Sequence, residues 1–385
     1  MKNFVFYNHT KILFGKGQIS QLADEIPEDS KILLIYGGGS IKNNGIYDQV
    51  TDAIDGFEYY EFSGIEPNPS YEKCMNALDM IDEYEIDFLL AVGGGSVVDA
   101  TKFIAAAALF EGEDPWDILA HNDEVYEALP IGVVLTLPAT GTEMNGNSVI
   151  SRIEYKQKLA FSSPEVLPLF SILDPVVIET LPKRQIGNGV VDAFVHVIEQ
   201  YLTYPVNAKV QDRMAEGILL TLIEEGPKVL DKPADYDACA NFMWSTTMAL
   251  NGLIGSGVPQ DWTTHNIGHE ITALHGVDHA RTLAIVLPGV MKVMKEAKKE
   301  KILQYAQRVW GISGLSNEET INAAIQKTIQ FFEAMGLKTR LSDYDIPVTT
   351  VDEIVDRMEE RGEIDMGENK LVGIEEIRKI LDIRY

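Results

Sequence analysis

Residues 88–107 read FLLAVGGGSVVDATKFIAAA, and this stretch decides the fold class. The continuous apolar run FLLAV indicates a strand buried on both faces, as in a parallel sheet. Three glycines and Ser96 follow at once, and the segment after them is typical of a buried helix. A strand, a glycine-rich turn and a helix in this order predict an α/β domain.

The same alternation extends through the first half of the chain. ILLIYGGGSI places Gly37, Gly38, Gly39 and Ser40 at the end of a second apolar strand. We therefore predict a doubly wound, Rossmann-like parallel sheet. Its strands are expected at 4–7, 11–14, 32–36, 59–62, 88–92 and 132–135.

The pattern changes after about Asp174. IGNGVVDAFVHVIEQYLT, DWTTHNIGHEITALHG and other segments have a 3.6-residue apolar repeat, which is typical of amphipathic helices. We predict an α/β dinucleotide-binding domain over residues 1–182 and an all-helical, metal-binding catalytic domain over 183–385. In such proteins the ligand site is expected in the crevice beside the carboxyl ends of the strands.

Composition limits the partners of this chain. Its 385 residues have a formal net charge of −27, which argues against nucleic acid or an anionic membrane as a partner. No apolar run approaches the roughly 20 residues that span a bilayer, and the first residues lack the layout of a signal peptide. The two cysteines, Cys74 and Cys239, have no metal-ligand spacing and suit reduced thiols in the cytoplasm.

A metal centre is predicted in the helical half. Asp192 and His196 are four residues apart, which places them on one face of a helix. With His265 and His279 they make one carboxylate and three imidazoles, a donor set that suits Zn²⁺ or Fe²⁺. His269 follows His265 by one helical turn and should face the same cavity, as a substrate-pocket residue or part of a proton relay.

The two glycine-rich turns predict phosphate binding. Glycines let the backbone approach a phosphate, and the helix after Gly94, Gly95 and Ser96 offers free N–H groups. Asp99 lies in the first turn of that helix, where it could interact with the N-terminus or a bound group. Neither turn is a GxGxxG fingerprint, and each could be an ordinary tight turn.

The first turn also bears on the choice of cofactor. An acidic residue near that strand end would bind an adenosine ribose and repel a 2′-phosphate. Gly37, Gly38 and Gly39 are neutral and small, and the hydroxyl of Ser40 can donate to a phosphate. The turn therefore favours NADP(H) over NAD(H).

A third polar loop, LTLPATGTEMNGNSVI, contains Thr136, Thr140, Asn145 and Asn147. It could line a cofactor or be a loop of common turn-forming residues. Lys158 stands alone, and a solvated surface lysine is its default interpretation.

DAFVHVIEQY, THNIGHE with the following histidine, GGGSVVDATK and PNPS together resemble the iron-dependent (group III) alcohol dehydrogenases. The similarity is greatest to the NADPH-dependent butanol dehydrogenases and aldehyde reductases, and it covers essentially the whole chain. The metal motif is highly specific, and the GGGS turns are less so. The resemblance implies a dehydroquinate synthase-like architecture of an α/β cofactor domain joined to a helical metal domain.

The resemblance also implies roles for individual residues. Asp192, His196, His265 and His279 become the metal ligands, and His269 a catalytic neighbour of the nicotinamide that is not a ligand. NAD-preferring members have an acid at the position of Gly38. The implied cofactor contacts are Gly37, Gly38, Gly39, Ser40, Asn68, Gly94, Gly95, Ser96, Asp99, Thr136, Thr140, Asn145, Asn147 and Lys158.

The implied activity is hydride transfer between NADPH and small aliphatic aldehydes of the butanal type, with the carbonyl oxygen on the metal. A homodimer is implied, and pairing through the N-terminal FVFY strand is one route. An NAD-linked polyol (glycerol-type) dehydrogenase and a dehydroquinate synthase-like lyase are alternatives. The lyase would need several pocket cations, which the ligand segments NGVVDAFVHVIEQY and DWTTHNIGHEITALHG lack. A non-catalytic nucleotide- and metal-binding protein is a third alternative.

Overall fold

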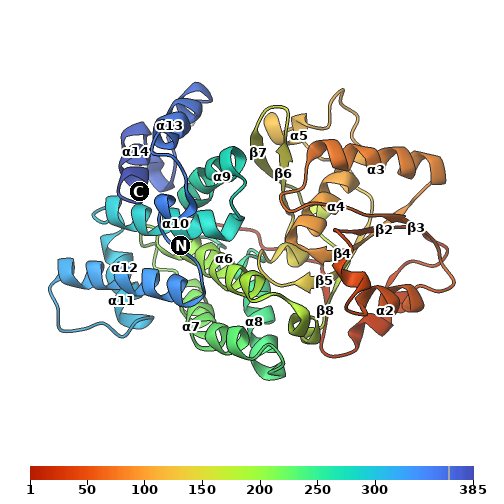
Figure 1. Cartoon of the computed structure of the whole chain (residues 1–385), viewed down its shortest axis with the longest axis horizontal. Helices are drawn as coiled ribbons and strands as arrows, with labels where there is room; N and C mark the ends of the chain where they lie inside the picture. The colour runs from red at the N-terminus through yellow and green to blue at the C-terminus, as the bar shows by residue number, and fades with distance from the viewer. Residues whose placement is uncertain (363–364) are drawn as a thin grey trace. The chain divides into compact units, whose positions relative to one another are not determined.

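The computed structural model describes residues 1–362 and 365–385, and its chain path is drawn in Figure 1. Backbone contacts divide the chain into two compact units. The α/β unit comprises Tyr7–Pro182 and Pro233–Thr247, and the helical unit comprises Met1–Phe6, Lys183–Lys232 and Met248–Tyr385.

The α/β unit is built on a six-stranded, all-parallel sheet in the order β1-β8-β5-β4-β2-β3. An antiparallel hairpin, β6–β7, is separate from it. The strands are β1 (Lys11–Phe14), β2 (Lys31–Tyr36), β3 (Glu58–Phe62), β4 (Phe88–Gly94), β5 (Ile131–Leu137), β6 (Asn147–Arg152), β7 (Gln157–Ser162) and β8 (Phe170–Leu173).

Helices of this unit connect the parallel strands, as parallel pairing requires. The α-helices are α1 (Leu22–Glu25), α2 (Ile46–Ala53), α3 (Tyr71–Tyr84), α4 (Gly95–Ala108), α5 (Asp117–Ala120) and most of α8 (Tyr236–Ala249). The 3₁₀ helices are η1 (Gln18–Gln21), η2 (Ser40–Lys42), η3 (Thr142–Met144), η4 (Pro164–Val166) and η5 (Pro175–Thr180).

The strand order reverses between β2 and β4. From β2 the chain moves outward to β3 at the edge, and from β4 it moves the other way through β5 to β8. β2 and β4 pair directly, with Tyr36 opposite Val92, so both GGGS turns leave the sheet at one edge. This reversal is the switch point at which doubly wound sheets bind ligands.

The predicted doubly wound parallel sheet is confirmed, with one wrong strand and one missed strand. Residues 4–7 form no strand, and the side chains of Phe4, Val5, Phe6 and Tyr7 are exposed. Their continuous apolar run indicated a strand, but pairing needs a partner strand, and no described residue of the chain supplies one. Phe170–Leu173 was missed; it is β8, buried between β1 and β5.

The helical unit contains eight α-helices and two 3₁₀ helices among its described residues. They are α6 (Lys183–Tyr201), α7 (Lys209–Asp231), α9 (Thr263–His275), α10 (His279–Val293), α11 (Lys299–Arg308), α12 (Asn317–Ala334), η6 (Leu341–Tyr344), α13 (Thr350–Glu360), η7 (Glu368–Lys370) and α14 (Ile374–Asp382). α10 is central, because it packs against α6, α9, α12 and α14. Almost every residue of α6 beyond Ile186 is buried, as expected for a helix surrounded by others.

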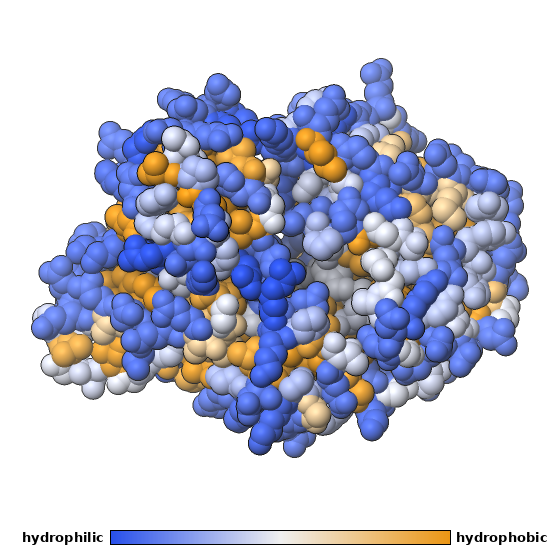
Figure 2. Space-filling view, viewed as in Figure 1, coloured by the Kyte–Doolittle hydropathy of each residue, from blue (hydrophilic) through white to orange (hydrophobic). Residues whose placement is uncertain are grey.

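Hydrophilic residues cover most of the visible face of the molecule in Figure 2, in keeping with the charge of −27. Among the described residues, no helix is long and apolar enough to cross a membrane.

A buried lysine organises the loop after β5. Lys102 of α4 is fully buried, and its ammonium donates to Thr142 O (2.6 Å), Thr142 Oγ1 (2.8 Å), Asn145 O (2.6 Å), Asn145 Oδ1 (3.1 Å) and Asn147 O (2.9 Å). Burial lowers the pKa of Lys102 to about 8, against the opposing effect of Asp99. The ammonium therefore ties the 142–147 loop to α4.

We expect Lys102→Met to destabilise the α/β unit by at least about 3 kcal/mol, since it leaves several buried oxygens without a donor. Lys31→Met, which removes an exposed ion pair with Glu85, is the control and should change stability far less. Thermal or denaturant unfolding measures both. Equal stabilities of the two variants would contradict the structural role of Lys102.

Candidate functional site

The helical unit brings the four predicted metal ligands together. Asp192 and His196 project from α6, His265 from the first turn of α9, and His279 is the first residue of α10. One ligating atom from each residue lies within 4.8 Å of the others. Asp192, His196 and His265 are buried, and His279 is half-buried.

Local packing positions the three ligand helices. Asp278, which precedes α10, accepts a hydrogen bond from Asn188 Nδ2 of α6 at 3.0 Å, so the start of α10 is tied to α6. Gly268 lets α9 approach α10 closely, because a Cβ there would lie 2.9 Å from Thr282 Oγ1. A larger residue at Gly268 would also meet Leu283 of α10, at 3.2 Å from its Cδ2.

The ligating atoms face one another. His196 Nε2 and His265 Nε2 are 3.1 Å apart, and their rings stack with centroids separated by 4.7 Å. His279 Nε2 lies 3.6 Å from Asp192 Oδ1. Four ligands at about 2.1 Å from a tetrahedral ion would be about 3.4 Å apart. The cluster therefore has the dimensions of a first-row metal site.

The donor set also fits a metal electrostatically. Burial, and then the neighbouring His265, hold the pKa of His196 well below its usual value, so this imidazole is neutral and has a lone pair to donate. His196 Nε2 and His265 Nε2 face each other at 3.1 Å, which suits a cation that both nitrogens can bind. One carboxylate and three imidazoles favour Fe²⁺ or Zn²⁺ over Mg²⁺ or Ca²⁺.

Aromatic rings enclose the ligands. Trp262 packs edge-on against His265, with ring centroids 5.2 Å apart, and against His196 at 6.2 Å. His269 is half-buried, and its ring lies 6.1 Å from His265 and 5.3 Å from His279. His269 is thus beside the cluster, as expected for the next turn of α9.

The residues behind the ligands were not predicted. Glu199 of α6 is buried, and one of its oxygens contacts His265 Nδ1. Lys298 is also buried and donates to Asp261 Oδ2 and Glu368 Oε2, each at 2.7 Å. Burial raises the pKa of Glu368 to about 7. The spacing could have predicted that Glu199 lies near the ligands, because it follows Asp192 by seven residues and is therefore on the same helix face.

In the α/β unit, the two glycine-rich turns lie side by side at the carboxyl edge of the sheet. Gly37, Gly38, Gly39 and Ser40 follow β2 directly. β4 runs through Gly94, and the fourteen-residue α4 begins at Gly95, so the free N–H groups of its first turn lie at the same edge. This edge can hold a dinucleotide phosphate.

The glycines after β4 also serve packing. A Cβ at Gly93 would lie 2.4 Å from Val97 Cγ2, at Gly94 2.9 Å from Leu137 Cβ, and at Gly95 2.7 Å from Thr140 Oγ1. At these three positions the fold itself excludes a side chain, independently of any ligand.

Several of the residues that were predicted to contact the cofactor form hydrogen bonds that stabilise the loop after β5. Asp99 accepts hydrogen bonds from Thr142 Oγ1 (2.7 Å) and Val149 N (3.1 Å). Asn145 Nδ2 donates to Gly141 O at 2.9 Å, and Asn147 O accepts from Lys102. Asp99, Asn145 and Asn147 are therefore parts of the framework of this loop.

The remaining predicted contacts lie around that loop. Thr136 is near the end of β5, and Thr140 Oγ1 accepts a long hydrogen bond from Thr142 N at 3.4 Å. Lys158 of β7 is buried and donates to Asn68 Oδ1 at 2.8 Å, so residues ninety positions apart in the chain meet. The default interpretation of Lys158 as a solvated surface lysine is therefore wrong.

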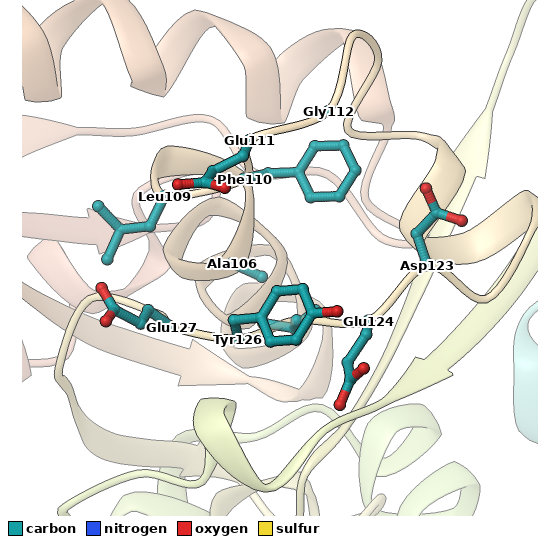
Figure 3. Close-up of a pocket in the computed structure, with 10 residues that line it drawn as sticks. Ala106, Leu109, Phe110, Glu111, Gly112, Asp123, Glu124, Tyr126 and Glu127 are labelled. Carbon is teal, nitrogen blue, oxygen red and sulfur yellow. The ribbon is translucent and has the colours of Figure 1, made fainter.

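A separate pocket of about 510 Å³ in the α/β unit is acidic. It is lined by residues 106, 109–112 and 123–127, and Figure 3 shows the rings of Phe110 and Tyr126 among its carboxylates. These are Glu111, Asp123, Glu124 and Glu127. Four acidic side chains make this pocket a poor site for a phosphate-bearing cofactor.

Comparison with known proteins identifies the family. Residues 9–175 match the model of the iron-containing alcohol dehydrogenases, and residues 187–383 match the C-terminal model of the Fe-containing alcohol dehydrogenase family. The chain is 55% identical to the NADPH-dependent aldehyde reductase YqhD of Escherichia coli, with 99% of both chains covered. It is 42% identical to a probable NADH-dependent butanol dehydrogenase of Bacillus subtilis, again with 99% of each covered.

The fold agrees with this assignment. A crystal structure of Escherichia coli YqhD matches the chain with a TM-score of 0.98 at 54% identity, covering 100% of this chain and 99% of that one. With two family models matching along its length, the chain belongs to the iron-containing alcohol dehydrogenase family.

Proposed function

We propose that this protein is a metal-dependent, NADPH-linked aldehyde reductase and alcohol dehydrogenase for small aliphatic substrates such as butanal and butanol. The convergence of Asp192, His196, His265 and His279 in a member of this family is the observation that supports it most directly. The 55% identity to an NADPH-dependent aldehyde reductase supports the direction and the cofactor.

The four clustered residues would hold a divalent ion. Once bound, the ion supplies Lewis acidity toward a carbonyl oxygen, and NADPH supplies the hydride. The packing of Trp262 on two ligand rings limits the access of water to them. His269 can hold or transfer a proton at a ring nitrogen, since its imidazole lies beside the cluster.

The proposed cofactor site lies at the switch point of the sheet. The first turn of α4 would bind the pyrophosphate, and Gly38 and Ser40, both exposed, would flank a 2′-phosphate. Glu61 of β3 is engaged by Tyr36, Tyr47 and Lys42, which reduces its repulsion of a phosphate. These features favour NADPH, although the Bacillus subtilis relative is named for NADH.

We also infer a cytoplasmic location and a homodimer. Cys74 and Cys239 are buried free thiols, which suits a reducing compartment. The segment 4–7 exposes Phe4, Val5, Phe6 and Tyr7, and Val5 is 93% exposed. A contiguous apolar segment of this kind is expected to be covered by a second copy of the chain.

Oxidation of NADPH with butanal should require the metal. Protein stripped with a chelator should be inactive and should recover with Fe²⁺ or Zn²⁺. His265→Ala should abolish metal binding and turnover together, while His121→Ala, at an exposed histidine, should retain both. Turnover by metal-free His265→Ala protein would refute the metal's role.

Preferential oxidation of glycerol with NAD would favour a polyol dehydrogenase, and no nicotinamide turnover would favour the lyase or non-catalytic alternatives.

Gly38→Asp should shift the preference from NADPH toward NADH. A Cβ at Gly38 meets no atom within 4 Å, so the fold accommodates the side chain. The new carboxylate should repel the 2′-phosphate and bind the ribose, lowering the NADPH/NADH ratio of kcat/KM at least about tenfold. Gly38→Asn has nearly the same shape without the charge and should keep the ratio. An unchanged ratio in Gly38→Asp would place the 2′-phosphate elsewhere.

Val5→Asp should weaken the dimer, because it places a charge in the exposed apolar segment. Light scattering after size exclusion should give twice the chain mass for the unmodified protein and a lower average mass for the variant. Val210→Asp, at another exposed valine, should leave the mass unchanged. A dimer of full stability in Val5→Asp would move the interface to another surface.

A further inference from the structure

The first turn of α9 is capped by two carboxylates from outside the helix. Thr263 N donates to Asp261 Oδ1 at 3.0 Å, and Thr264 N and His265 N donate to Glu199 Oε1 at 2.7 and 3.3 Å. These are three of the N–H groups that a helix leaves without a partner at its start. The helix that presents His265 is thus held at its beginning by buried anions.

The second oxygen of Glu199 contacts the ligand itself. In the tautomer with the ring proton on Nδ1, this nitrogen donates to Glu199 Oε2, which lies against it. The lone pair is then on Nε2, the atom that faces His196 Nε2 at 3.1 Å. One side chain therefore contacts both the backbone of this ligand and the ring nitrogen whose protonation decides the tautomer.

We propose that Glu199 is a positioning residue that holds His265 as the Nδ1–H tautomer and thereby sets the affinity of the metal site. The proposal rests on the metal site of the proposed function. In general, a carboxylate behind a metal-bound histidine fixes the ring orientation and makes the ligand more basic. Here the same carboxylate also caps the ligand's helix.

The balance of buried charge supports this role. Glu199 and Asp261 are each 4% exposed, and two adjacent carboxylates need compensation. Asp261 has its cation in Lys298 at 2.7 Å. Glu199 contacts the imidazole instead, so a divalent ion held by Asp192 and His265 would balance the charges of Asp192 and Glu199.

Glu199→Gln separates the two roles of this side chain. The amide oxygen can still accept from Thr264 N and His265 N, which keeps the helix capped. The amide NH₂ then faces His265 Nδ1, which must accept, and the ring proton moves to Nε2. Metal binding would have to displace that proton, so affinity should fall while the fold is kept.

Glu270→Gln is the matched control. Glu270 lies on α9 itself, is also 4% exposed, and is bound by Arg357 (2.8 Å) and Arg361 (2.7 Å) of the α13 region. The substitution removes a buried carboxylate from the same helix, but one that pairs with arginines. It should lower stability without changing the state of a ligand ring.

The test measures Zn²⁺ affinity of the full chain by competition with a chromophoric chelator. We expect Glu199→Gln to bind about 10- to 100-fold more weakly than the unmodified protein, and Glu270→Gln to bind within about threefold. Wild-type affinity in Glu199→Gln, or an equal loss in both variants, would overturn the proposal. If the unmodified protein itself binds no Zn²⁺, the metal site of the proposed function is wrong. If the unmodified protein binds Zn²⁺ and Glu199→Gln binds it equally well, only the role of Glu199 is wrong.

A second measurement reads the tautomer in the unmodified protein and does not depend on Glu199→Gln. In metal-free unmodified protein labelled with ¹⁵N-histidine, the ring resonances of His265 should show the proton on Nδ1, with assignment from His265→Asn. A proton on Nε2 would overturn the proposal, whatever the behaviour of Glu199→Gln.

Discussion

The convergence of one carboxylate and three imidazoles, of which only His279 is not fully buried, is the constraint on which the helical unit depends; one ligating atom of each residue lies within 4.8 Å of the others. Buried polar groups are costly unless they are paired or bind a metal. α6, α9 and α10 must therefore be held in close register. Gly268 allows the approach of α9 to α10, and Asp278 ties α10 to α6 through Asn188. Glu199 and Asp261 fix the start of α9.

The α/β unit depends on a different contact, the direct pairing of β2 with β4. This pairing brings both glycine-rich turns to one edge and aligns the start of α4 with them. Lys102 stabilises the arrangement from behind, because its ammonium satisfies five oxygens of the 142–147 loop. This edge of the sheet is thus supported by a buried ammonium group that donates to the loop after β5.

Local sequence patterns predicted the strands β2 and β4, the ligand helices and the residues of the metal cluster. The four-residue spacing of Asp192 and His196 determines a shared helix face, so their proximity follows from helix geometry alone. The sequence pattern could not show which carboxylate would contact His265 from behind. Glu199 is on α6 and His265 is on α9, so their contact depends on how these two helices pack. α8 illustrates the same limit: most of it packs in the α/β unit, although its sequence lies in the helical half. A lone lysine in an apolar helix, as at Lys102, indicates a buried ammonium group with several acceptors around it.

X-ray absorption of the zinc-loaded protein tests the proposed centre most directly. Asp192, His196, His265 and His279 should give a first shell of nitrogen and oxygen at about 2.0–2.2 Å with the multiple-scattering pattern of three imidazoles. One zinc should be present per chain, and His196→Ala should reduce the imidazole number or lose the metal. A shell of sulfur, or of water oxygens without imidazole scattering, would contradict a metal centre built from these four residues.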